Sequence, residues 1–172
     1  LSTDYVFGGE GTRPWAPDDA VTKPRNVYGQ TKYEGELAVR ANVSKYFIVR
    51  IAWVFGVNGN NFIKTMLRLG KERGAVSVVN DQIGSPTYTY DLAVLLCDMI
   101  ESDKYGNYHA TNEGLCSWYD FACEIFKCAG MDVKVTPVPA TEFPSKAKRP
   151  YNSRMSKEKL SENGFKRLPS WQ

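Results

Sequence analysis

Apolar residues along the chain fall into two patterns, short continuous runs and longer stretches with a repeat of three to four residues. The run KYFIVRIAWVFG at 45–56 is almost entirely apolar, as expected for a strand buried on both faces of a sheet. The stretch NFIKTMLRLGKERG at 61–74 places its apolar residues at helical spacing and ends at a glycine. The first pattern predicts strands, and the second predicts amphipathic helices.

These two patterns alternate over the whole sequence. Further strands are predicted at 1–7, 75–81, 106–112 and 133–139, and further helices at 27–41, from about Asp91, at 117–130 and at 156–164. Asn26 and Ser117 stand where N-caps are expected, and Gly130 and Gly164 stand where helices end. Alternating strands and helices imply crossover connections, so the predicted fold is α/β with a largely parallel sheet.

The composition is that of an ordinary globular domain, with 42% apolar and 24% charged residues among 172. The net charge of +3 is too small, and the basic residues are too scattered, to indicate a nucleic-acid-binding surface. The longest apolar run, LAVLLC at 92–97, is far shorter than the ~20 residues that a membrane span needs. We therefore expect neither nucleic acid nor a membrane among the partners.

Cysteine and histidine usage argues against zinc and against a hydrolase. Cys97, Cys116, Cys123 and Cys128 form no C-x-x-C pair, and the chain has a single histidine. Free, mostly buried thiols fit a reducing, cytoplasmic location. His109 has no serine–aspartate pattern around it, so we interpret it as a structural residue rather than as part of a catalytic triad.

Tyr28 and Lys32 lie one turn apart on one face of the helix predicted at 27–41. Parallel sheets bind ligands at the carboxyl ends of their strands, and the strand at 1–7 would bring Thr3 close to this helix. An ammonium beside a phenol favours the phenolate, so such a pair can exchange a proton near neutral pH, while a threonine hydroxyl holds a carbonyl oxygen in line. The spacing alone is weak evidence, because a half-buried Tyr and a solvated Lys meet this way by chance in many helices.

Five blocks of sequence, in this order, carry a resemblance to a known family: STDYVF, YGQTKYEGE, RIAWVFG with NNFIKTMLRL, NDQIGSPTYTYDLA and KRPYNSRMSKEKL. Together they closely resemble the dTDP-4-dehydrorhamnose reductase family, a branch of the extended short-chain dehydrogenases/reductases. The resemblance covers essentially the whole chain. Gly8, where an Asp is more usual, and Tyr33, where a Leu is more usual, are small departures from the family pattern.

The resemblance implies a partial Rossmann-type, doubly wound parallel sheet with a smaller α/β substrate-binding part. Residues 1–172 would form the C-terminal part of such an enzyme, with the last strands and helices of the dinucleotide-binding domain interleaved with the part that binds the sugar nucleotide. The glycine-rich segment with which the family begins does not precede Leu1. We therefore expect a C-terminal portion that has no reductase activity by itself.

The resemblance also implies the roles of three catalytic residues. Thr3 would position the sugar carbonyl, and Tyr28 would supply the proton. Lys32 would bind the nicotinamide ribose and tune Tyr28, so that Tyr28 and Lys32 both contact the cofactor. That cofactor is NADPH or NADH, and the sequence does not choose between them.

Four further residues would bind the substrate. Tyr5 and Trp53 would line the deoxysugar pocket, although Trp53 is equally well explained as a core aromatic on a buried strand. Arg149 and Asn152 lie in the segment that family members close over the nucleotide sugar, and an arginine suits a pyrophosphate. From the sequence alone, a solvated basic turn explains that segment equally well.

Two patterns imitate sites that we do not predict. The segment WVFGVNGNNF resembles a dinucleotide-binding fingerprint but lacks its third glycine, and a loop ending in an asparagine N-cap explains it better. Glu10, Asp18 and Asp19 form an acidic loop that could hold Mg²⁺, but no spacing supports this, and we predict no metal site.

The leading hypothesis is an enzyme that reduces dTDP-4-dehydro-β-L-rhamnose to dTDP-L-rhamnose with NAD(P)H, in the biosynthesis of dTDP-rhamnose for cell-envelope polysaccharides. A dTDP-sugar is then the expected partner, and a homodimer is compatible with the sequence. The alternatives are a non-catalytic regulatory subunit, like the β subunit of methionine adenosyltransferase, and a nucleotide-sugar epimerase of the same fold. The complete set of Thr3, Tyr28 and Lys32 favours an enzyme, and Trp53 favours the reductase; fold alone does not decide.

Overall fold

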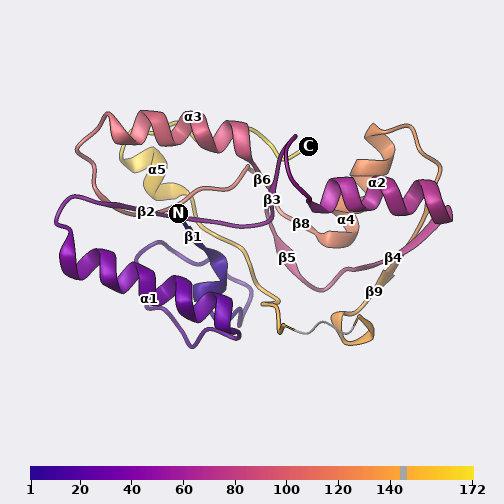
Figure 1. Cartoon of the computed structure of the whole chain (residues 1–172), viewed down its shortest axis with the longest axis horizontal. Helices are drawn as coiled ribbons and strands as arrows, with labels where there is room; N and C mark the ends of the chain where they lie inside the picture. Colours follow the sequence, from indigo (N-terminus) through magenta and orange to yellow (C-terminus); the bar gives the residue numbers. More distant parts are fainter. Residues whose placement is uncertain (144–146) are drawn as a thin grey trace.

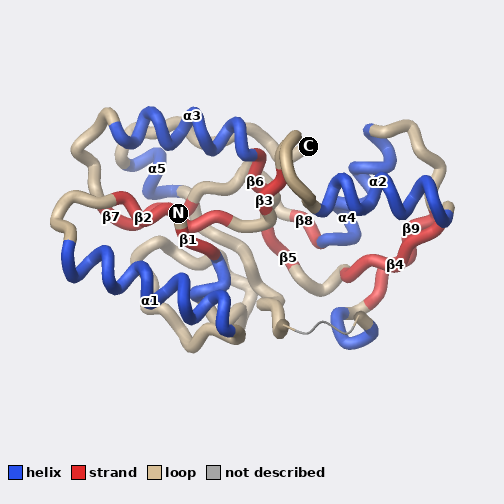
Figure 2. The backbone as a smooth tube through the Cα atoms, viewed as in Figure 1, coloured by secondary structure: helices blue, strands red, loops and turns tan. Residues whose placement is uncertain are grey.

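The chain folds into two lobes and passes between them several times, as Figure 1 shows for the computed structural model, which describes residues 1–143 and 147–172. The first lobe consists of β1 (Ser2–Thr3), the short 3₁₀ helix η1 (Asp4–Val6), α1 (Val27–Asn42), β2 (Phe47–Ile51), α3 (Thr89–Ile100), β7 (Gly106–His109) and α5 (Glu158–Glu162). The second lobe consists of α2 (Phe62–Arg73), β4 (Ala75–Val79), α4 (Trp118–Cys128), β9 (Lys134–Val138) and η2 (Ala140–Glu142). Between the lobes lie four two-residue strands (Figure 2), namely β3 (Val54–Phe55), β5 (Ile83–Gly84), β6 (Thr87–Tyr88) and β8 (Cys116–Ser117).

A parallel sheet in the order β1-β2-β7 forms the centre of the first lobe. Successive residues of β2 face opposite sides of it: Arg50 reaches Glu36 of α1, whereas Val49 packs into the apolar core that α3 and α5 complete. Figure 1 shows α1 and α3 on opposite sides of this sheet. Burial on both faces confirms the prediction of an α/β fold with a doubly wound parallel sheet.

The second lobe is built on the parallel pair of β4 and β9, against which α2 and α4 pack. Asn61 begins α2 by accepting a hydrogen bond from the Lys64 amide at 3.1 Å. Ser117 begins α4 through reciprocal hydrogen bonds with Asp120. In the segment WVFGVNGNNF, the part that follows β3 is a loop that ends in the N-cap Asn61, as predicted. This lobe is the smaller α/β part expected from the sequence.

Two predicted strands are shorter than expected. β1 ends at Thr3, because the Thr3 hydroxyl accepts the Tyr5 amide at 3.3 Å and starts the 3₁₀ turn of η1. The apolar run at 45–56 is two strands rather than one, since the backbone turns at Trp53, whose φ of 50° lies in the left-handed region. After this turn β3 leaves the central sheet and pairs with β6.

The expectation that the thiols are mostly buried is wrong. All four cysteines are free, but only Cys116 is buried, whereas Cys97 and Cys128 are exposed and Cys123 is intermediate. The two exposed cysteines, Cys97 and Cys128, lie on the outward faces of α3 and α4. The helical repeat predicted these helices but did not fix which side of each helix faces the core.

A buried guanidinium connects four segments of the first lobe. Arg50 on β2 is 1% exposed, and its Nε and Nη2 donate to the two carboxylate oxygens of Glu36 on α1 at 2.8 and 2.6 Å. Its Nη1 donates to the Pro17 carbonyl in the loop before α1 at 3.1 Å. The guanidinium also lies 4.9 Å from the centre of the Phe7 ring, a cation–π contact. Arg50 thus fixes α1, the loop and the turn after β1 relative to β2.

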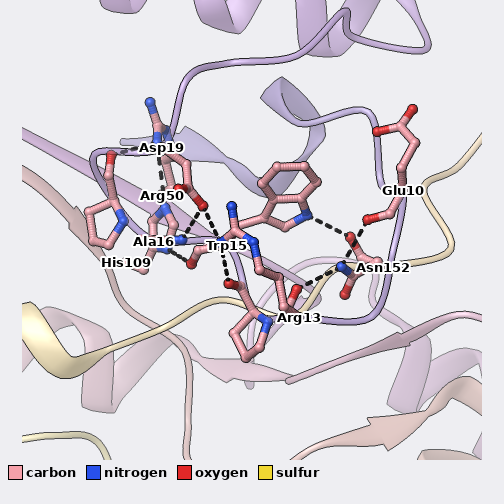
Figure 3. Close-up of polar contacts among 10 residues, drawn as sticks. Glu10, Arg13, Trp15, Ala16, Asp19, Arg50, His109 and Asn152 are labelled. Atoms are coloured by element: carbon pink, nitrogen blue, oxygen red, sulfur yellow. Dashed lines mark hydrogen bonds and ion pairs between the residues drawn. The ribbon is translucent and has the colours of Figure 1, made fainter.

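His109 on β7 completes this cluster, and Figure 3 shows it together with Arg50 and Trp15. Its Nδ1 lies 3.1 Å from the Trp15 carbonyl oxygen, and its Nε2 lies 3.5 Å from Arg50 Nη1. A carbonyl only accepts and a guanidinium only donates, so the ring is neutral with its proton on Nδ1. Burial, and next the Arg50 charge, lower the pKa of His109 to about 3. The structural role predicted for this histidine is confirmed.

The pKa of His109 makes stability depend on pH. In the unfolded chain the imidazole titrates near pH 6.5, whereas in the folded chain it titrates near pH 3, so stability present above pH 6.5 is lost as pH falls toward 3. Between pH 7 and pH 5 this loss amounts to about 2 kcal/mol. Urea unfolding at both pH values should show that extra loss in the wild type but not in His109→Gln. Equal losses in the two proteins would contradict the neutral, buried histidine.

Candidate functional site

A cavity of about 420 Å³ opens where β1 and β2 end, beside α1 and below the second lobe. Its wall includes Ala52 and Val54, the residues on either side of Trp53 where the chain crosses to the second lobe, and Trp118 from α4. Six of the residues that the sequence singled out line it, namely Thr3, Tyr5, Tyr28, Lys32, Trp53 and Arg149. These residues come from η1, the strand before it, α1, the β2–β3 turn and the segment after residue 147, so only the tertiary fold brings them together.

The three predicted catalytic residues lie on two neighbouring elements. Thr3 is buried at the end of β1, whereas Tyr28 is 54% exposed in the first turn of α1. Asn26 fixes this turn, because its side chain accepts the Gly29 amide at 2.8 Å. Lys32 follows one turn later, and its Nζ donates to the Leu1 carbonyl at 2.7 Å.

Gly29 allows α1 to approach η1 closely enough for this arrangement. A β-carbon at Gly29 would overlap the carbonyl oxygen of Tyr5 and lie 2.9 Å from its carbonyl carbon. With no side chain there, the ring of Tyr28 meets the ring of Tyr5 edge to face, with centroids 5.7 Å apart and an angle of 81° between planes. The close approach of α1 therefore places both tyrosines at the same cavity wall.

The wall beside Thr3 also contains a carboxylic acid, Asp4, which nothing in the sequence marked as a site residue. Asp4 is 3% exposed, and burial raises its pKa to about 6, although the hydroxyls of Ser153 and Thr3 oppose that shift. Burial, and then the Asp4 charge, raise the pKa of Tyr5. Tyr5 therefore presents a neutral hydroxyl to the cavity.

Trp53 both lines the cavity and packs against a neighbour. Its ring stacks on Trp118 with centroids 3.8 Å apart and planes at 19°. Gly84 lies against its other side, where a β-carbon would come within 3.1 Å of the indole. The two explanations that the sequence left open for Trp53, a ligand wall and a core aromatic, therefore both describe it. Trp118 was missed because nothing in the sequence indicates that α4 reaches this wall.

A second cavity of about 360 Å³ shares Trp118 and Arg149 with the first. Ser77, Gln82 and Phe143 are among its other lining residues. A ligand with two parts could therefore extend from one cavity into the other past the Arg149 guanidinium.

Asn152 does not reach either cavity. Its side-chain amide donates to the carbonyls of Glu10 and Arg13 at 3.2 and 2.9 Å, and its backbone carbonyl accepts the Trp15 indole N–H at 3.3 Å (Figure 3). This geometry therefore does not support the predicted contact between Asn152 and the substrate. Asn152 instead fastens the loop at 9–25 to the segment that carries Arg149.

Neither a membrane span nor a metal cluster is found in the part of the chain that the structure describes. No helix there is long and apolar enough to cross a bilayer. Within residues 1–143 and 147–172, no three His, Cys, Asp or Glu side chains lie close enough together to hold a metal ion. In the acidic loop, Asp18 pairs with Lys159 at 2.7 Å and Asp19 with Arg13 at 2.8 Å.

Comparisons with known proteins identify the family to which the chain belongs. Residues 1–172 match the family model described as RmlD substrate binding domain. A dTDP-4-dehydrorhamnose reductase from Escherichia coli K12 is 44% identical to the chain, and the match covers 99% of this chain and 60% of that protein. A crystal structure of a dTDP-4-dehydrorhamnose reductase from Bacillus anthracis in complex with NADP is 49% identical, with a TM-score of 0.95 over 99% of this chain and 60% of that one.

A third match has the same extent. The crystal structure of a dTDP-4-dehydrorhamnose reductase from Clostridium acetobutylicum is 49% identical, with a TM-score of 0.95, and covers 99% of this chain and 60% of that chain. The chain thus spans about 60% of the length of the relatives it matches.

Two glycines of α1 provide a matched test of the close approach. Gly29→Ala should lower the free energy of unfolding by about 1–3 kcal/mol, because the new methyl group must push α1 away from Tyr5. Gly35→Ala, in the same helix with nothing within 4 Å of its β-carbon, should raise it by about 0.5–1 kcal/mol through helix propensity. Urea unfolding of both variants checks this. If the two substitutions shift stability in the same direction, Gly29 does not hold α1 against η1.

Proposed function

Because the chain belongs to the RmlD substrate binding domain family, we propose that it carries the reductive site of an enzyme that converts dTDP-4-dehydro-β-L-rhamnose into dTDP-L-rhamnose. One observation carries the proposal: Thr3, Tyr28 and Lys32 line a single cavity together with Trp53. A hydroxyl, a phenol and an ammonium around an aromatic wall are the groups that reduction of a sugar carbonyl requires.

Thr3 and Tyr28 act on the carbonyl oxygen at C4 of the sugar. Both side chains line the cavity, so an oxygen bound between them accepts a hydrogen bond from each hydroxyl. These hydrogen bonds strengthen as negative charge develops on the oxygen during reduction. Tyr28 then transfers its phenolic proton to that oxygen, which gives the alcohol. Because Tyr28 is half exposed, it regains a proton from solvent.

Lys32 suits the ribose of a nicotinamide cofactor, NADPH or NADH. Its ammonium has three N–H donors, and among the described residues it gives one to the Leu1 carbonyl. The other two N–H groups are available to ribose hydroxyls at the cavity edge. When bound there, the cofactor supplies the hydride that reduces C4.

The rest of the substrate fits the two adjoining cavities. The rings of Tyr5 and Trp53 form a flat wall for the deoxysugar in the first cavity. Arg149 stands between the cavities, where a guanidinium pairs well with a pyrophosphate. The nucleoside then occupies the second cavity, against Phe143.

No observation favours the alternative functions. A regulatory subunit does not need a proton donor, a carbonyl-binding hydroxyl and a cofactor-binding ammonium around one cavity. An epimerase of this fold could use the same three groups, so the reductase is favoured over it by the family match and by the relatives named reductases. The second cavity beside Arg149 suits the nucleotide part of either a reductase or an epimerase substrate, and argues only against a regulatory subunit.

Removing the phenolic hydroxyl tests the reaction. In the protein encoded by the complete gene, Tyr28→Phe should lower kcat by about 10²-fold or more while KM for the sugar changes little, because the proton donor acts in the transition state. Tyr33→Phe is the matched control, since Tyr33 lies on the same helix but packs beside Val6 and Phe7 outside the cavity. Steady-state kinetics with a dTDP-4-dehydro-6-deoxy sugar measures both. Near-normal turnover by Tyr28→Phe would refute the assignment.

Removing the aromatic wall tests the substrate site. Trp53→Ala should weaken binding of the dTDP-sugar by about tenfold or more, while affinity for the cofactor changes by less than about twofold. Trp171→Ala, which removes an indole outside both cavities, should leave sugar binding unchanged. Separate calorimetric titrations with each ligand measure this. An equal loss of sugar and cofactor affinity would mean that Trp53 supports the whole site rather than the sugar.

A further inference from the structure

The carboxyl group of Asp4 is buried beside Thr3 with one of its oxygens unused. Thr3 Oγ1 lies 3.1 Å from Asp4 Oδ1, and the same hydroxyl accepts the Tyr5 amide at 3.3 Å. Asp4 Oδ2 is buried and makes no hydrogen bond of normal geometry among the described residues, although the Ser153 hydroxyl lies near enough to the carboxyl to lower its pKa against the effect of burial. Asp4 also lines the cavity that holds Thr3, Tyr28 and Lys32. An unpaired carboxylate oxygen is costly in such a place, so it calls for an explanation.

The hydrogen of the Thr3 hydroxyl can be given to only one acceptor. When Asp4 is ionised it can only accept, so the hydroxyl donates to Asp4 Oδ1 and has no hydrogen left for a ligand. When Asp4 carries its proton on Oδ1, it donates to Thr3 Oγ1, and the hydroxyl hydrogen is free to point into the cavity. The protonation state of Asp4 therefore sets the direction of the whole hydrogen-bond chain.

We propose that Asp4 is a positioning residue that must be protonated for Thr3 to donate a hydrogen bond to the sugar carbonyl. This inference rests on the proposed reduction and adds to it a residue that does not touch the reacting atoms. Asp4 keeps its proton throughout: the hydride still goes to C4, and the proton on the product oxygen still comes from Tyr28. The neutral carboxyl only fixes the orientation of the Thr3 hydroxyl.

The surroundings of Asp4 support a neutral carboxyl. Burial raises its pKa to about 6, and the titratable groups that share its cavity are Tyr5 beside it, Tyr28 and Lys32 on α1, and Arg149 opposite. β2 and the β2–β3 turn contribute only uncharged side chains to this wall. A sugar ring that fills the cavity lowers the polarity around the carboxyl and so favours the protonated form further. Binding of a ketosugar above pH 6 should therefore take up a proton.

Kinetics of a near-isosteric variant tests the orientation. In the protein encoded by the complete gene, kcat/KM of the wild type should fall about tenfold per pH unit between pH 7 and 8. Asp4→Asn, whose amide always donates to Thr3, should change by less than about twofold over the same range. In a Thr3→Val background, Asp4→Asn should no longer alter the pH profile. If the wild type is active and kcat/KM of Asp4→Asn also falls about tenfold per pH unit between pH 7 and 8, the inference is overturned. The proposed reductase function is unaffected by that result.

Calorimetry on the wild type gives a second test, which does not need the variant to fold or the enzyme to turn over. A dTDP-4-dehydro-6-deoxy sugar is titrated at pH 7.5 without cofactor, in buffers of different ionisation enthalpy. We expect an uptake of about one proton per chain for the ketone. The uptake should be smaller for dTDP-rhamnose, whose C4 hydroxyl can itself donate to Thr3. No uptake, or equal uptake for ketone and alcohol, overturns the inference. Absence of any reductase activity in the wild type would instead refute the proposed function.

Discussion

The buried ion pair between Arg50 and Glu36 determines where the site can form. Arg50 lies at the centre of the β1-β2-β7 sheet, and Glu36 joins α1 to that sheet while also accepting the Ser2 hydroxyl of β1. Removing one partner of such a pair leaves an uncompensated charge and typically costs about 3–5 kcal/mol. Because Tyr28 and Lys32 lie on the same helix as Glu36, this pair also sets their distance from Thr3.

The remaining wall of the site depends on how the chain leaves the sheet. The left-handed turn at Trp53 ends β2 and sends β3 toward the second lobe. Strain in such a turn is compensated by contacts on both sides, here the stacked Trp118 ring and the Thr87 hydroxyl, which donates to the Ala52 carbonyl at 2.6 Å. The same turn places the Trp53 indole in the cavity wall, so the crossing between the lobes also builds the aromatic wall of the cavity.

Local signals in the sequence predicted the elements well. Asn26 and Ser117 cap the helices that they were expected to cap, because the pairing of a cap side chain with nearby amides is a local interaction. The strand boundaries were less predictable: an apolar run looks the same whether it continues or turns at Trp53. The roles of Asp4 and Trp118 could not be predicted, because they depend on contacts between distant segments. Asn152 was predicted to bind the substrate but holds a loop in place instead. In a sequence, a polar loop residue that binds a ligand looks the same as one that fixes a loop.

Transfer of an isotopic label from cofactor to sugar tests the central claim most directly. The protein encoded by the complete gene is given dTDP-4-dehydro-β-L-rhamnose and NAD(P)H deuterated at the transferable C4 position of the nicotinamide. The site described here predicts dTDP-L-rhamnose with a single deuterium at C4 of the sugar, visible by NMR as the loss of the C4 proton signal. A product without that deuterium, with solvent exchange at the carbons next to C4, would contradict a reductase built on Thr3, Tyr28 and Lys32.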